Sequence, residues 1–196
     1  AAIDKIIGWL EKAKAVAENK AQGEALGLLI EYYKTGDLQT WDDYNVAWTS
    51  ATDGNIDYIN SFIEVYNDPV GYRGSYETVV QIKDFEMSQK MAVLSENAQW
   101  FEDNSPLMQE HKKANVVGVT YKVVDVAGEA GDASPSTPIG VNLPNANWIR
   151  AAVGSKSVSL GNIIGAYNNA GGSGRLQEFV HLSLIHISEP TRRTPI

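Results

Sequence analysis

The sequence predicts an α+β fold in which helices come first along the chain and strands follow. Apolar residues recur at helical spacing through the first fifty residues, whereas short runs rich in β-branched residues dominate from residue 78 onward. A hydrophobic content of 43% in 196 residues is sufficient for a packed core. We therefore expect a helical layer packed against a sheet built later in the chain.

Four helices are expected in the first part of the chain. Apolar side chains at three- and four-residue intervals predict one helix over 3–17 and another over 26–33, ending at a Thr-Gly-Asp break. Thr40 followed by Asp43 is typical of a capping box and predicts a third helix beginning there. Residues 56–63 are compatible with a short fourth helix.

The remaining elements alternate between strands and helices. Strands are predicted over 78–82 and 116–124, because these runs are rich in β-branched residues, and a short strand is predicted over 139–143. Residues 158–160 are expected to lead into the last helix. Helices are predicted over 87–101, 146–153 and from Asn162 to a glycine cluster at 171–174, and a loop over 128–138.

The composition excludes several classes of protein. A formal net charge of −8, with Lys112–Lys113 as the one basic cluster before residue 182, argues against nucleic-acid binding. The absence of cysteine excludes disulfides and thiolate metal ligands. It is compatible with a reducing compartment and also with a cysteine-free secreted protein, and the location we expect is the cytoplasm. No run approaches the roughly 18 apolar residues of a membrane-spanning helix, so no membrane partner is expected.

Metal, nucleotide and serine-hydrolase motifs are also absent from the sequence. Neither H-E-x-x-H nor the longer H-E-x-x-x-H occurs, and His111, His181 and His186 do not have the spacing of a zinc site. The glycine clusters lack the phosphate-binding motifs, and no G-x-S-x-G elbow is present. We therefore expect this chain to bind no metal itself.

Glu64 and Tyr66 are the first pair of candidate functional residues. They lie two positions apart in an extended segment, so both side chains should emerge on one face. A carboxylate beside a phenol suits a substrate ammonium and a developing oxyanion. A solvent-facing strand pair explains the spacing equally well, and is the commoner case.

Three further candidates come with similar alternatives. Residues 67–74 are typical of a hairpin turn that contains Arg73, so Glu77 either pairs with Arg73 or lines a cleft. Asn142 and Asn145 flank a Leu-Pro pair; Asn145 can cap the following helix, or both amides can grip an extended peptide backbone.

Long stretches of the chain resemble the bacterial branch of the dipeptidyl peptidase III family of zinc metallopeptidases. The resemblance rests on EVYNDPVGYRGSYE at 64–77, LSENAQWFEDNSPLM at 94–108 and GVNLPN at 140–145, and it covers most of 38–181. It implies a two-lobed enzyme with a helical, zinc-bearing upper lobe and a lower lobe built around a β-barrel. The chain is expected to be an incomplete piece of it, carrying one wall of the cleft.

The resemblance also implies roles for the candidate residues. Glu64 would bind the free α-ammonium of an oligopeptide substrate, and Tyr66 would hydrogen-bond the scissile carbonyl as the catalytic contact of this wall. Glu77 would be a further cleft carboxylate, while Asn142 and Asn145 would hold the N-terminal dipeptide. Zinc would belong to the full-length parent, so we expect this piece alone to be inactive.

The same resemblance divides the chain into segments. Residues 1–84 would supply the helical layer and first strands, 85–114 a helical excursion toward the upper lobe, and 115–160 the remaining strands and substrate loop. Residues 161–181 would begin the upper-lobe helices. The segment 182–196 resembles the translation of a sequencing adapter, and we expect it not to be native.

Two rivals stay open from sequence. One is a noncatalytic peptide-binding module that keeps the cleft wall without catalysis. The other is a structural domain that has inherited the resemblance without the function, which binding of a tetrapeptide would distinguish.

Overall fold

A computed structural model describes residues 2–116, 119–134 and 137–169. Residues 1–163 form one compact unit and 164–196 are assigned to a second. The glycine cluster at 171–174, where the last helix is predicted to end, and the adapter-like segment 182–196 lie outside the described residues. All candidate site residues fall within the first unit, described below.

Three helices form the N-terminal layer: α1 (Ala2–Ala15), α2 (Lys20–Thr35) and α3 (Leu38–Ser50). The side chain of Asn19 caps α2 by accepting the Gln22 amide, and α2 ends at Gly36, whose φ of 71° is left-handed. Asp37 caps α3 by accepting the amide of Thr40 at 2.9 Å. The predicted capping box at Thr40 was wrong, because Asp37 already satisfies that amide and places Thr40 in the first helical turn.

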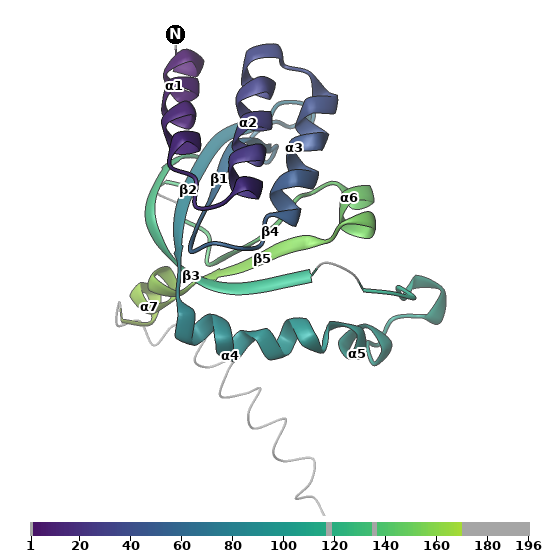
Figure 1. The fold of residues 1–196 in the computed structure, drawn as a ribbon. Helices are drawn as coiled ribbons and strands as arrows, with labels where there is room; N and C mark the ends of the chain where they lie inside the picture. Colours follow the sequence, from purple (N-terminus) through teal and green to yellow (C-terminus); the bar gives the residue numbers. More distant parts are fainter. Residues whose placement is uncertain (1, 117–118, 135–136, 170–196) are drawn as a thin grey trace, which may run out of the picture. The chain divides into compact units, whose positions relative to one another are not determined.

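The sheet has five strands in the order β1-β2-β3-β5-β4. All neighbouring pairs are antiparallel except β3 and β5, which run parallel. The sheet curls, with α1–α3 on one face and α4 on the other (Figure 1). The strands are β1 (Ile56–Glu64), β2 (Ser75–Lys83), β3 (Val119–Gly131), β4 (Gly140–Leu143) and β5 (Ser155–Leu160).

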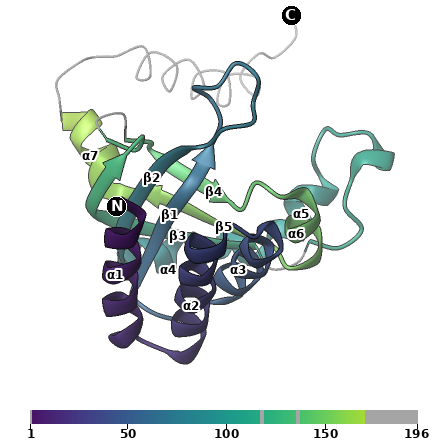
Figure 2. The ribbon, with the colours of Figure 1, turned by 90° about the horizontal axis from the view of Figure 1, so that it is seen from above.

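The predicted fourth helix over 56–63 was wrong, because this segment is β1. Ile56, Ile59 and Ile63 fit a helical interval as well as a strand, so the apolar spacing alone is ambiguous. Pairing decides the outcome: β1 forms a hairpin with β2, with Ile59 opposite Val79, and both of these side chains are buried. The hairpin extends away from the helical layer toward its turn at 65–74 (Figure 2).

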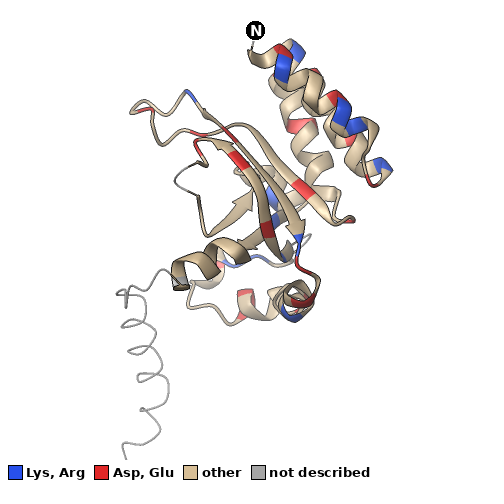
Figure 3. Cartoon of the chain, turned by 90° about the vertical axis from the view of Figure 1, so that its left-hand side faces the viewer, with Lys and Arg blue, Asp and Glu red and all other residues tan. Residues whose placement is uncertain are grey.

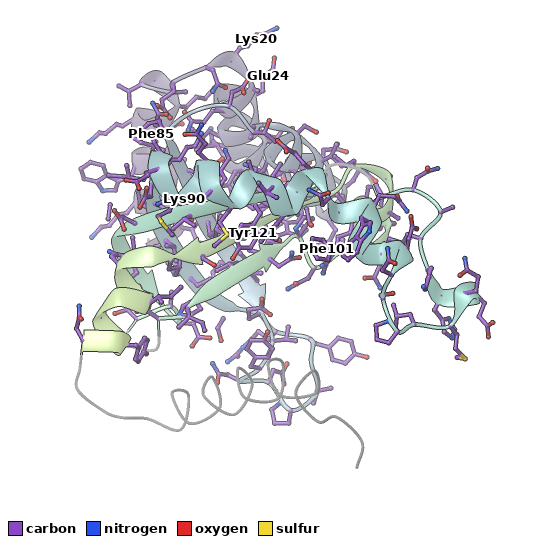
Figure 4. The ribbon with its side chains drawn as sticks, turned by 90° about the horizontal axis from the view of Figure 1, so that it is seen from below. Lys20, Glu24, Phe85, Lys90, Phe101 and Tyr121 are labelled. Atoms are coloured by element: carbon purple, nitrogen blue, oxygen red, sulfur yellow. The ribbon has the colours of Figure 1, made fainter. Side chains whose placement is uncertain are left out.

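The predicted helix over 87–101 is present as two helices, α4 (Phe85–Glu96) and α5 (Ala98–Asp103), separated at Asn97. A short 3-10 turn follows at Gln109–His111. Figure 4 shows α4 crossing β3, with Phe85 and Lys90 on the helix and Tyr121 on the strand. The Ser88 hydroxyl fixes this crossing by donating to the Val123 carbonyl and accepting the Val123 amide.

The C-terminal elements agree more closely with the expectation. Helix α6 spans Asn147–Ala152 and α7 spans Gly161–Asn169, as predicted within a few residues. Strand β3 continues to Gly131, so the predicted loop begins later than residue 128. The α+β class predicted from the sequence is confirmed.

The core joins the helical layer to the sheet and includes a residue just after β3. Leu29 of α2, Ile149 of α6 and Leu160 of β5 are fully buried. Ala133, which follows β3, and Leu143, the last residue of β4, belong to the same core cluster as α2 and α3. The segment after β3 is therefore anchored near its start by a buried apolar side chain.

Candidate functional site

The five residues singled out in the sequence line one cavity of about 480 Å³ near the hairpin turn. Glu64 and Tyr66 come from the end of β1 and the turn, Glu77 from β2, and Asn142 and Asn145 from β4 and the segment after it. A cavity of this volume is in the usual range for ligand pockets. Residues separated by up to 81 positions thus converge on one space.

A direct hydrogen bond joins Asn145 to Glu64. The Nδ2 of Asn145 donates to Oε1 of Glu64, 3.1 Å away. The alternative that Asn145 caps the next helix was wrong: α6 has Ala146 at its N-cap and no side-chain capping bond. Asn145 therefore orients a carboxylate across the cavity.

Tyr66 is 82% exposed, so its phenol is free of the core. A hydrogen bond to Glu64, and then the negative charge of that carboxylate, raise the pKa of Tyr66. The phenol therefore retains its proton and remains a hydrogen-bond donor at neutral pH. Asp68 organises the turn that follows by accepting the amides of Val70, Tyr72 and Arg73.

Glu77 is the most perturbed acid of the site. Burial first, then the charges of Glu64 and Asp132, raise the pKa of Glu77 to about 7. Among the described residues no ion pair or hydrogen bond joins Glu77 to Arg73, so the suggested structural pair was wrong. Glu77 instead faces the cavity with a proton that it exchanges near neutral pH.

Asn142 lies opposite Ser157 in the β4–β5 register, and its Nδ2 donates to the Ser157 hydroxyl. The side-chain oxygen remains available on this exposed residue. Strand β4 is the last strand of the described sheet and is paired to β5 alone. The side-chain amide of Asn142 thus belongs to a strand with one unpaired edge.

Two residues of the cavity were missed from the sequence. Asn67 and Asp132 line it as well, and the Nδ2 of Asn67 donates to Oδ1 of Asp132 at 3.1 Å. In the sequence both residues look like ordinary turn residues. Their meeting depends on the antiparallel pairing of β2 with β3, which places Glu77 opposite Gly131 and which no local pattern encodes.

The described residues do not fit a zinc ion. No group of three His, Cys, Asp or Glu side chains in the described ranges is arranged to hold a metal. His111 is exposed in the 3-10 turn, whereas His181 and His186 lie outside those ranges. The chemistry of this cavity is therefore that of carboxylates, amides and one phenol.

The fold places these carboxylates, amides and one phenol around a single cavity, and comparison with known proteins gives the family. The model of Peptidase family M49, a metallopeptidase family, matches residues 1–189. The chain belongs to this family. The matched region continues beyond His181 into the segment interpreted as an adapter, and that interpretation stays a prediction.

Two relatives of the chain support this family assignment. Dipeptidyl peptidase 3 of Homo sapiens is 32% identical over 162 residues, which is 83% of this chain and 22% of that protein. Dipeptidyl peptidase 3 of Nematostella vectensis is 30% identical over 166 residues, covering 85% of this chain and 22% of the relative. The chain thus spans about a fifth of the length of these proteins.

Two solved structures share the fold. DPP III from Caldithrix abyssi superposes with a TM-score of 0.73 at 28% identity, over 84% of this chain and 31% of that structure. Dipeptidyl-peptidase III from Corallococcus sp. strain EGB gives a TM-score of 0.71 at 24% identity, over 82% and 30% respectively. The sheet and its helices therefore correspond to part of a larger peptidase structure.

Proposed function

We propose that this chain forms the substrate-binding wall of a zinc-dependent dipeptidyl peptidase that releases dipeptides from the free N-terminus of oligopeptides. The observation that carries the proposal is the Glu64 carboxylate, held by Asn145 and facing a cavity that Glu77 and Tyr66 share. A carboxylate fixed in this way favours a charged ammonium. Membership of Peptidase family M49 supports the peptide substrate.

The release of dipeptides follows from the fixed distance between the group that binds the peptide N-terminus and the catalytic centre. Glu64 holds the α-ammonium, and the amides of Asn142 and Asn145 bind the backbone of the first two residues. An extended peptide beside β4 can use its unpaired edge, as in strand addition. The second peptide bond is thereby presented to the catalytic centre, which other parts of the parent peptidase supply.

Tyr66 supplies the one catalytic contact of this wall. Its protonated phenol donates a hydrogen bond to the scissile carbonyl oxygen as negative charge develops there. Zinc, in the parent enzyme, would activate the attacking water. We propose that the isolated chain, without that centre, is inactive, and that the parent acts in the cytoplasm.

The proposal is tested by Glu64→Ala in the full-length peptidase that contains this segment. We expect kcat/KM on free tetrapeptides to fall by about tenfold or more, because the ammonium loses a charge-assisted hydrogen bond. The same peptides with an acetylated N-terminus should be hydrolysed poorly by both enzymes, with little difference between them. Glu86→Ala, an exposed acid on α4, is the control.

An equal loss on free and acetylated peptides would contradict the assignment of Glu64. Tetrapeptide binding with no hydrolysis in the full-length protein would instead support the noncatalytic binding module. A protein that binds neither peptide would leave only a structural domain.

A further inference from the structure

Among the described residues, a side-chain hydrogen bond links the turn that follows Glu64 and Tyr66 to the segment after β3. Asn67 follows Tyr66 directly, and its Nδ2 donates to Oδ1 of Asp132 at 3.1 Å and to Oγ of Ser75 at 3.2 Å. Ser75 is paired with Glu64 across the hairpin. One amide therefore joins the two hairpin strands to a third segment, 65 positions away in sequence.

The Asp132 side of this contact is rigid. Gly131 has a φ of 71°, and a Cβ at that position would overlap the carbonyl oxygen of Tyr76. The amide of Asp132 donates to that same carbonyl at 2.8 Å, and the next residue, Ala133, is buried in the core. Asp132 is thus fixed to β2 and to the core by its own backbone.

On the Tyr66 side, the phenol is hydrogen-bonded to Glu64, but the backbone of the turn has few supports outside the turn itself. Tyr66 and Asn67 lie beyond the end of β1, and both are exposed. The turn is ordered internally by the bonds that Asp68 accepts, but these bonds join the turn only to itself. The bond from Asn67 to Asp132 is the described side-chain link between the turn and the loop after β3.

We propose that Asn67 and Asp132 are positioning residues that hold the Tyr66 phenol at the substrate cavity. The inference rests on the proposed role of Tyr66 in peptide hydrolysis. It adds Asn67 and Asp132 as the residues that keep the phenol in one position. Neither residue needs to touch the reacting carbonyl. Loss of their contact is expected to affect kcat more than KM, because the phenol is required in the transition state.

The test uses variants that separate the hydrogen bond from the charge. Asp132→Ala removes the acceptor. Asp132→Asn removes the charge and keeps a carbonyl oxygen that can accept from Asn67. Asn67→Asp places two carboxylates face to face, whereas the double variant N67D/D132N restores an amide–carboxylate bond with donor and acceptor exchanged.

In the full-length peptidase, Asp132→Ala and Asn67→Asp should each lower kcat by about three- to tenfold with a smaller change in KM. Asp132→Asn, which keeps an acceptor for Asn67, should lower kcat less than Asp132→Ala, and N67D/D132N should recover most of the loss of Asn67→Asp. Gln89→Glu, which adds the same charge on exposed α4, is the control and should leave kcat unchanged.

A second measurement is independent of catalysis. Amide hydrogen exchange of this chain should be faster over 65–74 in Asp132→Ala and Asn67→Asp, and should return toward the original rate in N67D/D132N. A swap variant no better than Asn67→Asp in both measurements would overturn the inference, as would unchanged exchange and kcat in Asp132→Ala. Failure of the proposed function is distinguishable, because exchange reports the contact whether or not Tyr66 is catalytic.

Discussion

The proposed hydrogen bond from the Tyr66 phenol to the scissile carbonyl can be tested by removing one atom. Replacement by Phe removes the phenolic oxygen and retains the ring, which is 82% exposed, so no core contact is lost. We expect Tyr66→Phe in the full-length peptidase to lower kcat by about tenfold or more, with little change in KM, as for loss of an oxyanion donor. Steady-state kinetics on a tetrapeptide measure both constants. A change confined to KM would mean that Tyr66 only binds substrate.

Glu77 gives the site a pH dependence whose sign is defined. Burial and its acidic neighbours raise its pKa from 4.5 to about 7, so the folded protein holds this proton more tightly than the unfolded chain. The resulting stabilisation is present below pH 4.5 and is lost as the pH rises through 7. After allowance for solvent screening, the loss is on the order of 1–2 kcal/mol.

Glu77→Gln should abolish that part of the pH dependence. Between about pH 5 and about pH 8, urea unfolding should show the original protein losing stability relative to this variant. Glu86→Gln on exposed α4 serves as the control and should follow the original protein. Parallel curves for Glu77→Gln and the original protein would show that Glu77 is an ordinary solvated acid.

The sequence named five candidate residues that lie around one cavity, but it did not predict their contacts. Glu64, Tyr66, Glu77, Asn142 and Asn145 were found through motifs, and all five line the cavity. The bond from Asn145 to Glu64 and the participation of Asp132 were not predictable, because both depend on pairing between distant strands. Local spacing favoured a helix-capping role for Asn145, whereas in the folded chain its side-chain amide donates a hydrogen bond to Glu64.

At the scale of elements, a buried ion pair joins β1 to β5 and contacts the helical layer through Trp48. Lys156 of β5 contacts Asp57 of β1 at 2.8 Å, and its side chain is only 6% exposed. Asp57 also accepts the indole N–H of Trp48 from α3 at 3.1 Å, and the ammonium lies 4.2 Å from the centre of that ring. Burial lowers the pKa of Lys156, while Asp57 opposes the shift.

Removal of one partner should therefore be costly. Asp57→Ala leaves the Lys156 ammonium buried without its carboxylate, and we expect a loss of about 3 kcal/mol in the free energy of unfolding. Urea denaturation measures it. Glu11→Ala breaks the exposed pair with Lys34 and should cost less than about 1 kcal/mol. Equal effects of the two substitutions would show that the buried pair has no special structural role.

Element types were predictable where one periodicity dominated, as in α1, α2 and β2. They were not predictable at 56–63, where helical and strand spacing coincide and the pairing with β2 decides. The division of 87–101 into α4 and α5 was also missed. Asn97, between the two helices, has a φ of −101° and a ψ of 14°, a local departure that the apolar spacing does not reveal.

At the scale of the whole molecule, basic and acidic side chains are interspersed on the helices, and acidic residues also occur on the sheet strands (Figure 3). Three carboxylates, those of Glu64, Glu77 and Asp132, line the one cavity described above. Such a cluster of acidic groups favours the approach of a positively charged ligand group.

The chain also corresponds to only part of its relatives, at about a fifth of the length of the human protein. Its described residues include the cavity and its carboxylates, and no group of three His, Cys, Asp or Glu side chains among them is arranged to hold a metal. No helix among those residues is long and apolar enough to cross a membrane. Peptide binding to this chain can be measured separately from hydrolysis by the full-length peptidase.

The central claim is that Glu64 recognises a free peptide N-terminus, and calorimetric titration of this chain tests it most directly. A tetrapeptide and its N-acetylated counterpart would be titrated into the original chain and into Glu64→Gln. We predict that the original chain binds the free peptide about tenfold more tightly and that Glu64→Gln removes this difference. Equal affinity of the original chain for the two peptides would contradict the account.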